Sequence, residues 1–287
     1  MKSAVARVDP DTAHRLESAA LYSPLSLAMW ARPRHYNVRA HHRLISRAWS
    51  DMAGGHGERL LVTCPPQVGK SELSSVYAPA WWLLNHPEQR VVIATYADHL
   101  AQEKGREVRA VISEHGHRFG TGVRRGSASV TDWRTVQGGG LRAVGVGGSL
   151  VGFPAQLALV DDPHKDREHA DSKVMRGRVW KWWSSVLTSR LAPGASACLI
   201  MTRWHPQDLA GLLLNREGRI EEGGRWRVLE LPAFAVEGDP LGRAPGDPLP
   251  HPAIDEADVA GARAHWEAQR AATVLPRDWA SLYQCSP

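Results

Sequence analysis

The sequence predicts an α/β protein, with a mostly parallel sheet flanked by helices, a small helical N-terminal segment and a C-terminal lid or linker region. Short apolar runs of the kind that form buried parallel strands recur along the chain, at residues 60–62, 90–96, 155–161, 197–201 and 225–231. Between several of these runs, apolar residues recur at the spacing of an amphipathic helix. Three of the runs lead directly into polar or charged residues, which parallel strands bring together at one edge of a sheet.

The composition is typical of a globular protein. At 287 residues, of which 43% are hydrophobic, the chain can bury a sizeable core as one large domain or two small ones. No apolar run approaches the roughly 20 residues that a membrane-spanning helix needs, and the N-terminus lacks the pattern of a signal peptide. The three cysteines form no Cys-x-x-Cys pair, which indicates buried thiols in a reducing cytoplasm, with no zinc site and no membrane partner.

The charge permits a polyanionic partner without establishing one. The net charge is +5, and the basic residues are 29 arginines and 6 lysines. Arginine suits bidentate contact with phosphate better than lysine does. The nucleotide composition of the genome explains the excess of arginine equally well, so both interpretations stay open.

The strongest single pattern lies at residues 59–71. An apolar run at residues 60–62 leads into Pro65-Pro66-Gln67-Val68-Gly69-Lys70-Ser71, and a helical stripe begins directly after it. Strand, turn, Gly-Lys-Ser and helix is the layout of a phosphate-binding loop, in which backbone N–H groups surround a polyphosphate. The ammonium of Lys70 would contact the β- and γ-phosphates, and the hydroxyl of Ser71 would hold Mg²⁺. The residues expected to bind the nucleotide are Pro66, Gln67, Val68, Gly69, Lys70, Ser71 and Glu72.

This loop also departs from the full pattern. Cys64 stands where the pattern has a glycine, and an ordinary turn with a surface lysine is the alternative interpretation.

A second candidate site follows the run at residues 155–161, which ends in Asp161-Asp162-Pro163. Carboxylates at the carboxyl end of a parallel strand lie at the edge where ligands bind in open α/β folds. We expect Asp161 to hold Mg²⁺, directly or through water, and Asp162 to orient or deprotonate the attacking water. The alternative is a simple Asp-Asp-Pro turn, but the phosphate loop upstream favours the hydrolytic interpretation.

A third candidate site is Thr202-Arg203-Trp204-His205, at the end of the run at residues 197–201. Thr202 is placed to sense the γ-phosphate of a nucleotide. Arg203 beside it would pair either with phosphate or with an acid.

The remaining segments are less determined. Residues 1–57 form the N-terminal helical segment, in which Tyr36 and His41 would either contact adenine or pack in the core. Residues 58–232 form the expected ATPase core, and residues 233–287, rich in proline near their start, form the lid or linker. One helix is expected from about residue 168 to residue 191, ended by Pro193-Gly194.

The three sites together resemble the ATPase part of phage terminase large subunits, of the prophage-type branch. The segments that carry the resemblance are residues 65–72, 160–165, 201–205, 208–211 and 279–284. The resemblance implies a P-loop NTPase of the additional-strand (ASCE) type, with ATP and Mg²⁺ as cofactors. By position, Lys70 and Ser71 match the phosphate loop, Asp161 the Mg²⁺ carboxylate and Asp162 the catalytic acid. Thr202 matches the motif that couples hydrolysis to DNA movement.

The same resemblance implies the partners. It implies double-stranded DNA as the moved substrate, a ring of subunits docked on a viral portal protein in the host cytoplasm, and a small terminase subunit as helper. Many terminases also donate an arginine to the neighbouring subunit's ATP, often just before the glycine at position 152. Val151 stands there, so Arg142 is the substitute candidate. The family often has arginine where Gln67 stands, and glutamate where Asp162 stands.

The resemblance also implies a two-domain protein, in which a nuclease domain follows the ATPase domain. We expect this chain to be the ATPase half alone, as a fragment, a split gene or a truncated prophage remnant. Two other functions stay open. One is a helicase-like nucleic-acid motor, and the other is an inactive prophage remnant that binds nucleotide or a partner without turnover.

Overall fold

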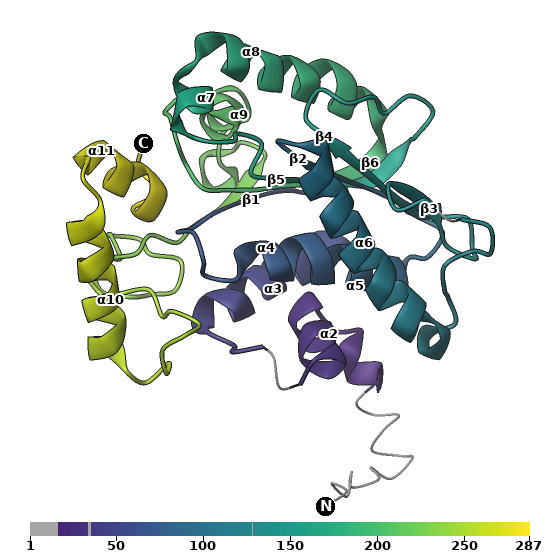
Figure 1. Ribbon diagram of the computed structural model, residues 1–287, viewed down its shortest axis with the longest axis horizontal. Coiled ribbons are helices and arrows are strands. Elements are labelled where there is room, and N and C mark those ends of the chain that lie inside the picture. The colour runs from purple at the N-terminus through teal and green to yellow at the C-terminus, as the bar shows by residue number, and fades with distance from the viewer. Residues whose placement is uncertain (1–16, 34–35, 128) are drawn as a thin grey trace, which may run out of the picture.

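The computed structural model describes residues 17–33, 36–127 and 129–287. Within these residues the chain forms a sheet with helices on both faces, as Figure 1 shows. The strands are β1 (Arg59–Thr63), β2 (Arg90–Thr95), β3 (Asp132–Arg134), β4 (Gly140–Gly145), β5 (Ala155–Asp161), β6 (Leu191–Met201) and β7 (Trp226–Glu230). The predicted α/β class is therefore confirmed.

The order of the strands defines the topology. Across the sheet it is β3-β4-β2-β5-β6-β1-β7, and among these strands of the described residues only the β3–β4 pair is antiparallel. The strand before the phosphate loop, β1, pairs with β6 and not with β5, so one additional strand separates it from the strand that ends in the aspartates. The carboxyl ends of β5, β6 and β1 are adjacent, which brings the three candidate sites to one edge.

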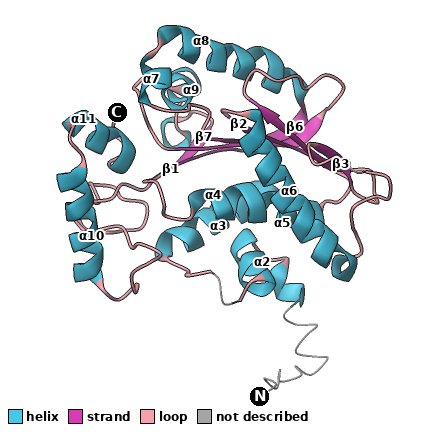
Figure 2. Cartoon of the chain, in the orientation of Figure 1, coloured by secondary structure: helices cyan, strands magenta, loops and turns pink. Residues whose placement is uncertain are grey.

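Each face of the sheet is buried under its own helices (Figure 2). Leu60 and Val62 of β1 lie in the apolar cluster under the helices of one face, whereas Leu61 lies in the cluster of the other face. The first face is covered by α2 (Pro24–Ala31), α3 (Ala40–Gly54), α5 (Ala78–Asn85) and α6 (Asp98–His115). The second is covered by α8 (Lys173–Lys181), the π-helical η3 (Trp182–Leu187) and α9 (Leu209–Glu217). Burial on both faces explains why these strands are continuous apolar runs.

The helix that follows the phosphate loop is continuous but not regular. It begins as α4 (Lys70–Glu72), widens into a π-helical turn, η1 (Leu73–Tyr77), and continues as α5. Pro79 lies in the first turn of α5 and has no backbone N–H to donate to the carbonyl of residue 75. The wide turn just before Pro79 accommodates this missing hydrogen bond.

The prediction of one continuous helix over residues 168–191 was wrong. The segment expected to be helical from about 168 to 191 is divided into α7 (Arg167–Asp171), α8, η3 and η4 (Thr188–Arg190), because Ser172 ends one helix and caps the next. Pro193-Gly194 does not follow the helix directly. It lies inside β6, where the register between β5 and β6 is irregular, so neither residue has to join a regular ladder.

The C-terminal region packs against the segment that follows the edge strand β7. It consists of α10 (Val259–Ala272), α11 (Pro276–Asp278) and η6 (Trp279–Tyr283), which lie beside the carboxyl end of β1 in Figure 1. The backbone N–H of Ala233 donates to the carbonyl of Tyr283 at 2.7 Å, and that of Phe234 donates to the side chain of Gln284 at 2.9 Å. None of the helices in the described part of the chain is both long and apolar enough to cross a membrane.

Candidate active site

The loop after β1 has two residues with positive φ. Gln67 has a φ of 61° and Gly69 a φ of 81°, so two of its residues lie in the left-handed region. Gln67 is exposed at the tip of the loop, whereas the side chain of Val68 is buried in the core. The helix begins at Lys70, and its first backbone N–H groups therefore lie next to the loop.

The ammonium group of Lys70 links the three candidate sites. Its Nζ donates to the hydroxyl of Thr202 at 3.1 Å and lies 4.0 Å from Oδ2 of Asp162. Burial disfavours the charged form of Lys70, but the neighbouring carboxylates of Asp162 and Asp161 outweigh it and raise the pKa of the ammonium. The group therefore stays protonated.

Asp161 is held by two hydroxyls from the helix that carries Lys70. Its carboxylate accepts from Ser71 at 3.2 Å and from Ser75 at 2.6 Å. Burial and the neighbouring charge of Asp162 raise the pKa of Asp161 to about 6. Ser75 was not among the predicted site residues, although its position four residues after Ser71, on the same helical face, could have indicated it.

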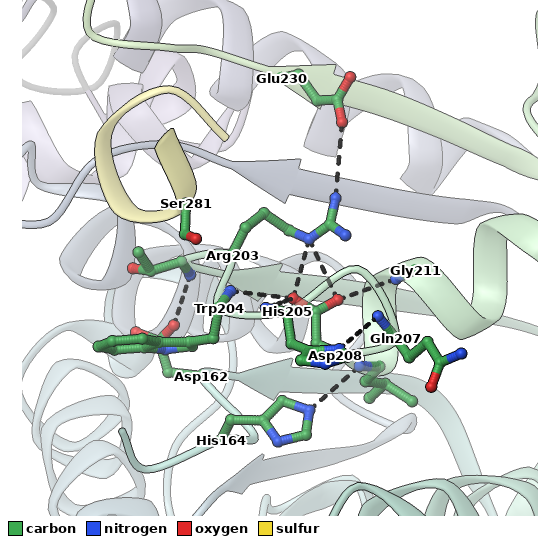
Figure 3. Close-up of polar contacts among 12 residues, drawn as sticks. Asp162, His164, Arg203, Trp204, His205, Gln207, Asp208, Gly211, Glu230 and Ser281 are labelled. Carbon is green, nitrogen blue, oxygen red and sulfur yellow. Dashed lines mark hydrogen bonds and ion pairs between the residues drawn. The ribbon is translucent and has the colours of Figure 1, made fainter. Parts of the chain in front are cut away.

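Asp162 faces the open side of the site. Its backbone adopts a φ of 42°, and its Oδ1 accepts from the backbone N–H of Thr202 at 2.7 Å, the contact drawn in Figure 3. This bond fixes the carboxylate and leaves Oδ2 to face Lys70 and solvent. A pocket of about 190 Å³ lies here, and it is lined by Ser71, Thr95, Tyr96, Leu100, Lys104, Asp161 and Asp162.

Ser71 and Asp161 have the chemistry expected of Mg²⁺ ligands. A hydroxyl and a carboxylate oxygen within hydrogen-bonding distance are hard oxygen donors, and Mg²⁺ sites commonly combine one or two carboxylates with substrate phosphates and water. Within the described residues, no group of three or more His, Cys, Asp or Glu side chains could hold a metal alone. A site completed by nucleotide phosphates fits this arrangement.

The sequence left open whether Arg203 pairs with a phosphate or with an acid, and in the structure it pairs with an acid. Its Nε donates to both carboxylate oxygens of Asp208, at 3.2 and 3.0 Å, and Nη1 lies 3.9 Å from Glu230 (Figure 3). The fully buried Asp208 also caps α9 by accepting from the N–H of Gly211 at 3.0 Å. A side chain at Gly211 would collide with the carbonyl of Pro206, which explains the glycine in this motif.

His164 is a further buried group that the sequence did not single out. Its Nε2 accepts from the backbone N–H of Leu209 at 3.2 Å, which ties the segment after Asp162 to the start of α9. Burial lowers the pKa of His164 to about 4, so the ring is neutral. Only the tertiary structure brings these two segments together.

Arg142 lies away from the other candidates. It is on β4, and three strands, β2, β5 and β6, separate it from β1, which is about 19 Å at the usual strand spacing. Its Nη2 forms an ion pair of 2.5 Å with Asp132, and its guanidinium lies over the ring of Phe153. The structure therefore does not bring Arg142 to the site of its own chain.

The aromatic residues considered for adenine lie behind the phosphate loop. Tyr36 packs edge-on against His42 and Tyr77. His41 is fully buried, with its Nε2 2.9 Å from the carbonyl oxygen of Val68. Both observations favour the packing role that the sequence left open.

The buried titratable groups predict a loss of stability in weak acid. Burial lowers the pKa of His41 to about 3 and of His42 and His164 to about 4, from 6.5, whereas that of Asp161 rises from 3.8 to about 6. Between about pH 4 and pH 6, unfolding adds three histidine protons and releases one carboxyl proton. A net uptake of two protons lowers the free energy of unfolding by up to about 3 kcal/mol per pH unit as the pH falls. Urea unfolding at pH 7 and pH 5 measures this change.

Two variants separate this linkage from a general acid effect. His164→Gln keeps an acceptor for the N–H of Leu209 but removes one buried titration, so its pH slope should be smaller by about one proton. His99→Gln changes an exposed histidine on α6 and should keep the wild-type slope. A free energy of unfolding that stays constant or rises from pH 7 to pH 5 would contradict the prediction.

Comparison with known proteins gives one family. A family model described as terminase large subunit, T4likevirus-type, N-terminal, matches residues 61–286. The HK97 bacteriophage large terminase is similar in structure, with a TM-score of 0.51 and 12% identity over 82% of this chain and 47% of that chain. The Thermus phage P74-26 large terminase ATPase domain has a TM-score of 0.48 and 17% identity over 80% of this chain and 88% of that one. None of the curated proteins compared with the chain matches it.

The strand order and the loop after β1 define the class of protein, an additional-strand (ASCE) P-loop NTPase fold. Because the family model covers most of its length, the chain belongs to the phage terminase large-subunit family. It spans about half the length of the HK97 large terminase.

Proposed function

We propose that this chain is the Mg²⁺-dependent ATPase motor of a phage terminase large subunit, which drives double-stranded DNA into a viral procapsid. The contacts among three candidate site residues support this proposal most strongly. Lys70, Thr202 and Asp162 contact one another at the carboxyl ends of three adjacent strands, beside the Ser71–Asp161 pair. The family model that matches residues 61–286, that of terminase large subunits, agrees with this proposal.

The residues at this edge have separable roles in the proposed reaction. Lys70 supplies a fixed positive charge to the β- and γ-phosphates, while the loop backbone positions them. Asp162, held by the N–H of Thr202, orients the attacking water through Oδ2, which faces Lys70 and solvent, and accepts the water's proton. Ser71 and Asp161 would hold Mg²⁺, which neutralises charge on the phosphates when it is bound. Thr202, which contacts both Lys70 and Asp162, would relay the state of the site to the segment that follows β6.

The assembly is part of the same proposal. The chain would act in a ring on a portal protein in the host cytoplasm, assisted by a small terminase subunit. Residues 58–232 would form the ATPase core, with residues 1–57 and 233–287 as the N-terminal segment and the lid or linker. Arg142, which does not reach its own site, stays a candidate for contacting a neighbour's nucleotide. Such a contact would require it to leave Asp132.

The test is steady-state ATP hydrolysis with and without linear double-stranded DNA, in the presence and absence of Mg²⁺. We expect Mg²⁺-dependent turnover that DNA increases. Strand separation of a forked duplex would instead favour a helicase-like motor. Nucleotide binding without turnover under every DNA condition would favour an inactive remnant.

A further inference from the structure

Two histidines contact the same carbonyl group of the phosphate loop. The carbonyl oxygen of Val68 lies 2.9 Å from Nε2 of His41 and 2.8 Å from Nε2 of His42. Both rings are almost completely buried, and both come from the first turn of α3. A backbone carbonyl can only accept, and its two lone pairs can be used by two donors at once.

The local contacts decide which ring nitrogen of His42 carries the proton. The backbone N–H of Arg39 donates to Nδ1 of His42 at 3.0 Å, so Nδ1 is the acceptor and Nε2 carries the hydrogen. Burial lowers the pKa of both histidines, to about 3 for His41 and about 4 for His42. Both rings are therefore neutral donors at neutral pH and add no charge behind the loop.

The bonded carbonyl fixes the orientation of the next N–H group. The peptide unit between Val68 and Gly69 is planar and trans, so its C=O and N–H point in opposite directions. Holding the oxygen against α3 therefore turns the N–H of Gly69 away from α3. The residues on either side of Val68, Gln67 and Gly69, both have positive φ, and such strained conformations persist only where surrounding contacts determine them.

The fit between His42 and the loop is also close. A Cβ atom added to Gly69 would come within 2.6 Å of Nε2 of His42. The histidine therefore occupies the space that any side chain at position 69 would need.

We propose that His41 and His42 are positioning residues, which hold the Val68–Gly69 peptide so that its N–H is presented to a phosphate group of the nucleotide before the nucleotide binds. The inference rests on the proposed function, because it assigns a polyphosphate to this loop. It adds a role for α3, an element outside the motifs of the site.

The test compares two replacements of His42 with a control on the same helix. His42→Leu removes the donor, and we expect it to weaken binding of both ATP and inorganic tripolyphosphate about 5-fold to 10-fold, the scale of one hydrogen bond. His42→Gln restores an N–H donor and should bind both within about 3-fold of wild type. Ile45→Ala leaves a cavity in the core on the same helix, so it should lower the Tm without changing either affinity.

The measurements are competition by tripolyphosphate against a fluorescent ATP analogue, with the Tm of each variant. Equal tripolyphosphate affinity in wild type and His42→Leu would overturn the inference, and so would a loss in Ile45→Ala as large as in His42→Leu. Because tripolyphosphate binding needs no turnover, a chain that binds it but does not hydrolyse ATP contradicts the proposed function alone. A wild-type chain that binds no tripolyphosphate contradicts both.

Discussion

Replacing Lys70 by alanine is expected to lower ATP turnover about a thousandfold or more while the chain stays folded. The ammonium is a buried cation, placed 3.1 Å from the Thr202 hydroxyl and 4.0 Å from Asp162, and a preorganised charge of this kind acts on the transferred phosphate. Removing it leaves two neighbouring carboxylates without their cation. Asp161, whose pKa is already about 6, can take up a proton and relieve their repulsion.

The measurement is release of inorganic phosphate at saturating Mg²⁺ and ATP, with the far-UV circular dichroism of each protein. Lys181→Ala is the matched control, because Lys181 is an exposed lysine on α8 and should keep the wild-type rate. Turnover by Lys70→Ala at the wild-type rate would refute the assignment of the phosphate loop.

Asp162→Asn is expected to bind ATP normally but to turn it over about 10²-fold to 10⁴-fold more slowly, the usual contribution of a general base. The amide cannot accept the proton of the attacking water. Its oxygen can still accept from the N–H of Thr202, so the geometry around Lys70 is retained. Asparagine also tolerates the positive φ of this position better than most residues, which makes it a test of charge with little change in backbone strain.

Separate measurements of nucleotide affinity and maximal rate decide this prediction. Glu168→Gln removes an exposed carboxylate in α7 and should change neither quantity. If Asp162→Asn lowers the affinity but not the maximal rate, Asp162 serves in binding and another group is the base.

The fold could be predicted from the sequence because its central strands are buried on both faces. Continuous apolar runs such as residues 90–95 leave little alternative once helical stripes lie between them. The segment before β6 was harder to predict. Its helix is divided at a capping serine, and Pro193-Gly194 fits an irregular strand as well as a helix end, a choice that depends on register with β5.

The candidate site was predictable where its residues are neighbours in the sequence. Gly69-Lys70-Ser71 and Asp161-Asp162 each combine a residue pattern with the end of a strand, and the sheet brings them together. His42 and Ser75 were missed because their partners are 26 and 86 residues away in the sequence. The spacing of Ser75 from Ser71 indicates a shared helical face, but no local pattern records which carbonyl or carboxylate such side chains will contact.

The wide π-helical turn at Leu73–Tyr77 contains about one residue more than a regular α-helical turn. Residues 70–72 face the edge with the candidate site, whereas residues 78–85, which include Trp81 and Trp82, pack in the core. Deleting one residue from the wide turn would therefore restore a regular α-helix with residues 70–72 and 78–85 near their present orientations, whereas deleting one within α5 would rotate the residues after it by about 100°. The wide turn is therefore the part of this helix where the loss of one residue would least disturb the contacts of Trp81, Trp82 and Ser71.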